Sequence, residues 1–274
     1  MTVPTPARVA ASFARLREEG RTGFIPFLTA GDPSLAFTEK AVASLDRPGV
    51  AAIEIGIPFS DPLADGPTIQ RSSERALAAG VRLSDVLSLV RSLRSGITAP
   101  IVLMSYMNPI LRLGMERFAG RAARAGVDAL IATDLPMEEA KEYRKVMKEA
   151  GLGTVFLAAP TSPPERVRKI ARASTAFLYY VSLTGVTGER KALSSGLARR
   201  LEEVRSLSPV PVSVGFGIST PAQAKGIAPH ADAVVMGSAL VHAVEEERSD
   251  AARLRALGAK VDGVLRALSP GTRR

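Results

Sequence analysis

Cysteine is absent from the 274 residues, and histidine occurs only twice. Without cysteine the chain can form no disulfide framework, no thiolate nucleophile and no cysteine-ligated metal site. His230 and His242 stand at no metal-ligand spacing, so we expect both to be structural and the chain to bind no metal. Long apolar runs are also lacking, and the first twenty residues carry several charges, so neither a membrane span nor a signal peptide is indicated. We therefore expect a cytoplasmic protein without membrane contact.

Negative charge is in deficit, because 36 Lys and Arg residues outnumber 27 Asp and Glu residues and give a formal net charge of +9. The basic residues are spread through predicted helices, as in 91–94 and 199–205, which is typical of a solvated surface. No dense basic tract with interleaved aromatic residues accompanies them, so we expect no nucleic-acid partner. A basic surface would still favour encounter with an anionic substrate.

A repeated unit organises the chain: a short apolar run, then a polar turn, then a stretch of helical period. Eight apolar runs are predicted as strands, at 24–30, 50–57, 100–106, 127–132, 154–159, 176–182, 211–215 and 233–236. Helices are predicted between them at 35–45, 84–93, 115–125, 138–150, 164–173, 193–207 and 221–227, and a last one at 249–268. The strands are almost continuously hydrophobic, which indicates a parallel sheet covered on both faces.

This order predicts an α/β fold, a (β/α)8 TIM barrel that forms a single domain over residues 1–274. Within residues 1–20, a helix at 8–19 is expected to cap the lower end of the barrel, and residues 269–274 are expected to form a flexible tail. An open doubly wound sheet is the alternative. Its usual phosphate fingerprint, G-x-G-x-x-G after the first strand, is replaced here by T-A-G-D-P at 29–33, which favours the barrel.

The most informative single residue is Glu54, which interrupts the apolar run A-A-I-E-I-G-I. An ionised carboxylate is costly to bury there unless it is paired or functional, and burial would raise its pKa toward the range useful for general acid and base catalysis. A buried ion pair with a lysine or arginine from a neighbouring strand is the structural alternative. None of the eight predicted strands contains either residue, so we favour a catalytic role for Glu54.

Asp65 lies in F-S-D-P-L-A-D-G-P-T, a loop whose prolines restrict the backbone and whose Gly66 permits a tight turn. Such a loop could hold Asp65 above the barrel mouth, where working residues of this fold gather. The alternative is that Asp61 and Asp65 are ordinary turn residues. We predict function for Asp65 and a structural or interfacial role for Asp61.

Glycine clusters follow the last three predicted strands and fit a phosphate site, because glycine lets backbone N–H groups approach an anion at a helix N-terminus. We assign Gly188, Gly217, Gly237 and Ser238 to phosphate, with Thr187 close by. Within and directly after the predicted strands there is no lysine, and Lys191 stands farther along its loop. The sequence therefore argues against a Schiff-base or metal-dependent aldolase and for carboxylate chemistry on a phosphorylated substrate.

Seven segments together resemble the tryptophan synthase α subunits, over roughly residues 24–241. They are F-I-P-F-L-T-A-G-D-P from residue 24, E-I-G-I-P-F-S-D-P-L-A-D-G-P-T-I-Q from 54, Y-M-N-P-I from 106, D-L-P from 134, G-V-T-G from 185, G-F-G-I-S from 215 and G-S-A from 237. The second segment is long enough to be highly specific, whereas the glycine clusters alone would not be.

The resemblance implies a carbon–carbon lyase that splits indole-3-glycerol phosphate into indole and glyceraldehyde 3-phosphate. Glu54 would shuttle protons between the C3′ hydroxyl and indole C3, and Asp65 would stabilise charge at the indole N–H. The further residues that the resemblance places at the substrate are Phe27, Met104, Tyr106, Tyr179 and Thr187. Met104 departs from the leucine more usual in the family.

The resemblance also implies a partner, a β subunit that carries pyridoxal phosphate and receives the indole within an α2β2 tetramer. This chain would hold no cofactor of its own. Interface contacts are expected from Pro58, Asp61, Asn108 and Pro136. Three other readings stay open at this point: a stand-alone lyase that releases free indole, a non-catalytic activating subunit, and a basic barrel that binds nucleic acid. The presence of both Glu54 and Asp65 argues against the second.

Overall fold

Eight parallel strands close into a barrel in chain order, each hydrogen-bonded to the next and β8 to β1. The computed structural model describes residues 7–181, 195–215 and 217–269. The strands are β1 (Gly23–Thr29), β2 (Ile53–Gly56), β3 (Ile101–Ser105), β4 (Ala129–Ala132), β5 (Gly153–Ala158), β6 (Leu178–Val181), β7 (Val212–Gly215) and β8 (Ala233–Met236). The barrel predicted from the sequence is confirmed, with each strand within its predicted run or beginning one residue before it.

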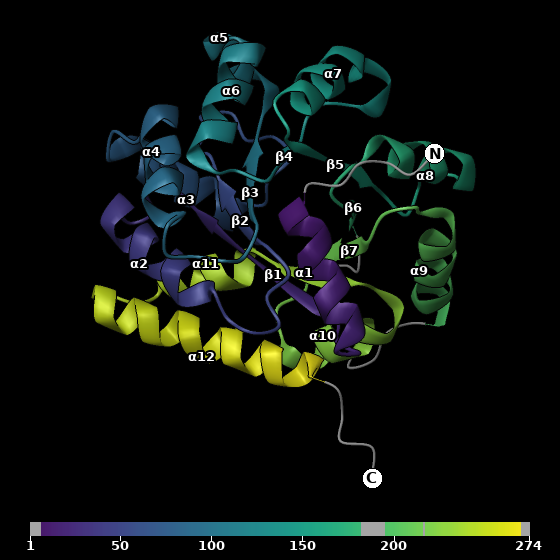
Figure 1. Cartoon of the computed structure of the whole chain (residues 1–274). Coiled ribbons are helices and arrows are strands. Elements are labelled where there is room, and N and C mark those ends of the chain that lie inside the picture. Colours follow the sequence, from purple (N-terminus) through teal and green to yellow (C-terminus); the bar gives the residue numbers. More distant parts are fainter. Residues whose placement is uncertain (1–6, 182–194, 216, 270–274) are drawn as a thin grey trace.

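Helices form a ring around the strands (Figure 1). They are α1 (Ala7–Glu18), α2 (Leu35–Leu45), α3 (Pro67–Ala78), α4 (Leu83–Leu93), α5 (Met107–Leu113), α6 (Met115–Ala125), α7 (Lys141–Glu149), α8 (Pro164–Ala173), α9 (Ser195–Leu207), α10 (Pro221–Ile227), α11 (Ser238–Glu245) and α12 (Asp250–Leu268), with 3-10 turns η1 (Met137–Glu139) and η2 (Ala228–His230). Within the described residues, no helix combines the length and the apolar character needed to cross a bilayer.

Three helical predictions needed correction. The helix predicted at 138–150 is divided at Ala140 into η1 and α7. No helix is predicted from the sequence at α3 or α5, and Pro67 is predicted to lie in a loop. Pro67 is the first residue of α3, and Pro109 lies in the first turn of α5, where a missing backbone N–H costs nothing. The expected flexible tail, apart from Ser269, lies outside the described residues.

The strands divide their side chains between two cores. One face of each strand packs against the surrounding helices, and the other points into the barrel. Large apolar side chains such as Ile25, Phe177 and Val235 fill the barrel, and α1 closes its lower end with Val9, Phe13 and Leu16 from the same cluster. The lower half is therefore a packed core, and the space for a ligand lies toward the carboxyl ends of the strands.

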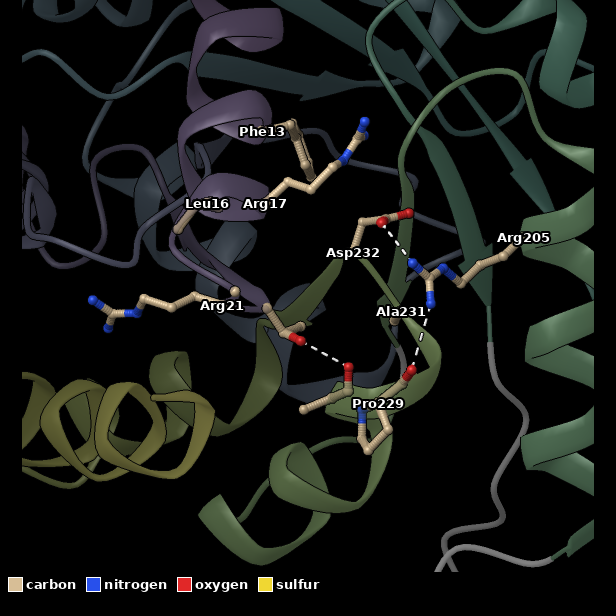
Figure 2. Close-up of a pocket in the computed structure, with 11 residues that line it drawn as sticks. Phe13, Leu16, Arg17, Arg21, Arg205, Pro229, Ala231 and Asp232 are labelled. Carbon is tan, nitrogen blue, oxygen red and sulfur yellow. Dashed lines mark hydrogen bonds and ion pairs between the residues drawn. The ribbon is translucent and has the colours of Figure 1, made fainter. Parts of the chain in front are cut away.

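Ionic contacts hold the lower end together. Asp128, directly before β4, is buried and accepts hydrogen bonds from Arg8 of α1, from Arg94 Nη1 at 3.0 Å and from the backbone N–H of Ile101 at 2.8 Å. A cavity of about 190 Å³ lies between the end of α1 and the segment before β8, where Arg205 and Asp232 form an ion pair of 3.1 Å (Figure 2). It opens at the amino ends of the strands, at the opposite end of the barrel from the predicted site.

Candidate active site

Glu54 occupies the interior of the barrel without an ionic partner among the described residues. Its neighbours in register are Phe27 on β1 and Val102 on β3, so the side chain enters an apolar layer. Only 1% of the residue is exposed, and Oε1 has no hydrogen-bond partner in the described part of the chain. Burial raises the pKa of Glu54 from 4.5 to about 8. The carboxyl is thus mostly protonated at neutral pH and can both give and take a proton.

The hydroxyl of Tyr179 on β6 is influenced by the charges of both carboxylates. The residue is 9% exposed, and its pKa is raised by burial first and then by the charges of Glu54 and Asp65. Tyr179 thus lies close enough to both carboxylates for their charges to act on its hydroxyl. The structure brings together the three residues that the sequence assigned to the reaction and its substrate.

Asp65 is held over the barrel by Tyr106, which follows β3. The Tyr106 hydroxyl donates to Asp65 Oδ2 at 3.1 Å and accepts from the backbone N–H of Ala64 at 2.9 Å, and its ring stacks on Phe59 at 5.1 Å. Burial raises the pKa of Asp65, and the Tyr106 hydrogen bond partly offsets that rise. The side chain of Gln70 also donates to the Asp65 carbonyl at 2.9 Å. Asp65 is therefore fixed by Tyr106, which follows β3, and by Gln70 of the helix that begins after its own loop.

An apolar wall stands beside Glu54. Phe27 is 3% exposed and packs with Ile69 and Val241, and Met104 lies against the same cluster. Glycine makes room for the ring: a Cβ at Gly56 would lie 2.6 Å from Phe27 Cζ. Phe27 and Met104, which were predicted to line the aromatic end of the substrate, thus lie together.

The predicted phosphate residues are described only in part. Gly237 is the N-cap of α11 and the exposed Ser238 its first residue, so free backbone N–H groups face outward at that helix end. Gly217 is exposed and has a φ of +76°, a left-handed conformation that favours glycine. Thr187 and Gly188 lie outside the described residues.

The predicted interface residues differ in accessibility. Asp61, Asn108 and Pro136 are exposed, whereas Pro58 is buried. The sequence reading missed Leu63, which lies in the same loop as Asp61 and is 93% exposed, and Leu111 of α5, which is 57% exposed. Periodicity could not reveal them, since a lone leucine in a loop carries no pattern. Single exposed leucines are common on protein surfaces, so these two become interface candidates only because they lie close in the sequence to Asp61 and Asn108.

Metal ligation has no support in the described residues, which contain no cluster of three or more histidine, aspartate or glutamate side chains suited to an ion. His230 lies 3.0 Å from Glu202, and His242 lies near Glu245 and Glu246. Asp32, one of the acidic residues at a strand end, is paired with Arg75 of α3. Glu54 and Asp65, by contrast, have no ion pair among the described residues.

Comparison with known proteins agrees with this geometry. The family profile described as tryptophan synthase alpha chain matches residues 13–266. The chain is 51% identical over 267 residues to the tryptophan synthase alpha chain of Geobacter sp. strain M21, covering 97% of this chain and all of that one. A solved structure of tryptophan synthase from Mycobacterium tuberculosis is similar with a TM-score of 0.87 at 37% identity, over 98% and 100% of the two chains.

A second similar structure is described as the tryptophan synthase α2β2 complex from Pyrococcus furiosus. It has a TM-score of 0.84 at 41% identity, and the match covers 89% of this chain and 98% of that one. The family profile spans all eight strands, and the relatives are matched over nearly their whole length. The chain therefore belongs to the tryptophan synthase alpha chain family.

Proposed function

We propose that Glu54 and Asp65 carry out the reaction of this chain, which as a tryptophan synthase alpha chain cleaves indole-3-glycerol phosphate to indole and glyceraldehyde 3-phosphate. The observation that carries the proposal is the buried carboxyl of Glu54, whose Oε1 has no partner among the described residues and whose pKa is raised to about 8. A group of this kind is suited to exchange protons near neutral pH.

The retro-aldol cleavage needs two proton transfers at neighbouring atoms. Neutral Glu54 donates its proton to indole C3, and the positive charge that results on the ring nitrogen is stabilised by the carboxylate of Asp65. Ionised Glu54 then takes the proton of the C3′ hydroxyl, the C3–C3′ bond breaks, and its electrons return to the indole ring. The C3′ carbon becomes the aldehyde, and Glu54 ends protonated as it began.

Asp65 is suited to stabilise the positive charge on the ring nitrogen because its side chain is fixed before the substrate arrives. Tyr106 holds Oδ2 at 3.1 Å, so the carboxylate needs little reorganisation when charge develops beside it. Phe27, Met104 and Tyr179 form the wall against which the indole ring packs.

The phosphate of the substrate binds at the start of α11. The N–H groups near Gly237 and Ser238 are free at that helix end, and the helix dipole favours an anion there. Gly217 contributes from the turn after β7; Gly188 and Thr187, which the sequence assigns to the same phosphate, lie outside the described residues.

The partner is a β subunit in an α2β2 tetramer, and the pyridoxal phosphate of the full reaction belongs to that subunit. The exposed residues Asp61, Asn108 and Pro136, together with Leu63 and Leu111, form the contact surface. Pro58, at the start of the loop that carries Asp61, is buried.

The test is cleavage of indole-3-glycerol phosphate by the purified chain, followed as indole release with and without the β subunit. Strong activation by the β subunit supports the subunit role, and high turnover that the β subunit leaves unchanged indicates a stand-alone lyase. A Leu63→Asp variant should lose activation while keeping its unaided turnover. Wild-type turnover in a Glu54→Gln variant would refute the catalytic assignment.

A further inference from the structure

An ionic cluster links the two helices that flank the proposed site. Arg75 of α3 donates from Nε and Nη2 to both oxygens of Asp32, each at 2.7 Å, and from Nη1 to Glu245 Oε1 at 2.7 Å. Arg71, one turn earlier in α3, donates hydrogen bonds to both carboxylate oxygens of Glu245, each at 2.9 Å. Glu245 is the last residue of α11. The guanidinium of Arg75, in the last turn of α3, therefore bridges the loop after β1 and the end of α11.

The two linked helices carry opposite ends of the proposed substrate site. Asp65 directly precedes Gly66, the N-cap of α3, and Gln70 of α3 holds the Asp65 carbonyl at 2.9 Å. Helix α11 begins at Ser238, where the phosphate is proposed to bind. Any sliding of α3 against α11 would thus change the separation between the catalytic carboxylate and the phosphate.

The contact beneath the cluster is small and apolar. Ile69 of α3 and Val241 of α11 meet at Phe27, and these three residues form a cluster of their own. Apolar packing of this size is not directional, whereas a forked arginine contact fixes both distance and angle. The Asp32 side chain is only 5% exposed, so the Arg75 fork is shielded from solvent on that side.

We propose that Arg75 is a positioning residue that, through Glu245, fixes the distance between Asp65 and the phosphate-binding end of α11. The inference rests on the proposed function, because it assigns the two ends of one substrate to the two helices. A ligand that contacts both Asp65 and the start of α11 binds more tightly because this distance is fixed. A ligand that contacts only one of them gains no affinity from it.

Glu245→Gln is the decisive variant, because it weakens the link between α3 and α11 and leaves the Arg75–Asp32 fork in place. Arg75→Lys keeps the charge but cannot bridge both acids. Arg47→Gln is the matched control: Arg47 is an arginine of similar exposure, 31% against 35%, with a 2.6 Å ion pair to Asp262 far from the site.

Three quantities are measured on each variant. The first is the Kd of inorganic phosphate, which reports one end of the site. The second is the Kd of a substrate analogue that lacks the C3′ hydroxyl and therefore spans the site without being cleaved. The third is kcat and KM for indole-3-glycerol phosphate in the presence of the β subunit. Urea unfolding of each variant checks that the chain is folded under assay conditions.

The expected result for Glu245→Gln and Arg75→Lys is an unchanged Kd for inorganic phosphate, a roughly 10-fold weaker Kd for the analogue, and a kcat/KM lowered by a factor on the order of 10 to 100. Arg47→Gln should match the wild type in all three. Should Arg75→Lys fail to fold, Glu245→Gln decides alone.

Wild-type affinity of Glu245→Gln for the analogue would overturn the proposal, as would an equal loss of affinity for phosphate and analogue, which indicates a general loosening of α11. Failure of the proposed function would look different, because the wild-type chain itself would then neither cleave the substrate nor bind the analogue.

Discussion

Replacing Glu54 by glutamine should make the protein more stable at alkaline pH while it removes activity. The wild-type carboxyl has a pKa of about 8 in the folded chain against 4.5 for the ordinary group. The folded state therefore holds a proton that the unfolded state releases as soon as the pH exceeds 4.5, and wild-type stability falls as the pH rises through that window. The loss is complete once the pH exceeds the folded pKa.

The size of the loss follows from the two pKa values. Each pH unit between them corresponds to about 1.4 kcal/mol, so the fully ionised carboxylate destabilises the fold by ~5 kcal/mol relative to its protonated form. Glutamine does not ionise, so Glu54→Gln avoids this cost. Any constant penalty for burying its amide is the same at every pH and cancels when the two proteins are compared across the pH range.

The assay is urea unfolding of the wild type and of Glu54→Gln at about pH 5 and about pH 9, with turnover measured on the same preparations. The difference in free energy of unfolding between the two proteins should shift by several kcal/mol in favour of glutamine at the higher pH, whereas turnover should fall by a factor of at least about 100. A pH-independent difference would show that Glu54 is ionised and paired in the folded chain, which would refute the argument from burial.

Three other changes give distinct expectations. Asp65→Asn should lower kcat by a factor on the order of 100 with a smaller effect on KM, because the lost charge matters most in the transition state; steady-state kinetics with substrate checks this. Gly215→Ala places a Cβ 2.8 Å from Tyr179 Cζ and should lower kcat/KM by about 10-fold, with partial recovery in a double variant that also carries Tyr179→Phe. Asp128→Asn removes a buried negative charge that pairs with two arginines and should lower the free energy of unfolding by ~3 kcal/mol while leaving KM unchanged, as urea unfolding and kinetics can show.

The barrel could be predicted because its strands are short and apolar and are separated by stretches of helical period, which are local patterns. Proline led to a wrong prediction at α3, since the same residue type ends a helix interior and begins a first turn. Whether a proline ends a helix or begins one depends on the backbone geometry of the helix cap. At Pro67 that geometry is the backbone conformation of Gly66, where the loop ends.

The residues of the site also differ in how far the sequence alone could indicate them. Glu54 could be singled out because one acidic residue within an apolar strand is conspicuous in the linear sequence. The fork from Arg75 to Asp32 and Glu245 could not, because its members are separated by 43 and 170 residues and each is unremarkable in its own segment. Their meeting depends on how α3 and α11 pack on β1, which the hydrophobic period does not encode.

The glycines after the last strands are predicted from the sequence for one role, phosphate binding, and they also have a second role, which is steric. Gly217 adopts a left-handed turn, as a phosphate loop requires. Gly215, two residues earlier, instead makes room for the ring of Tyr179, and a Cβ at Gly237 would lie 3.3 Å from Phe27. Gly215 and Gly237, at the phosphate end of the proposed site, leave room for Tyr179 and Phe27, the two aromatic residues of the indole wall. A side chain added at Gly215 or Gly237 would therefore displace both ends of the substrate together.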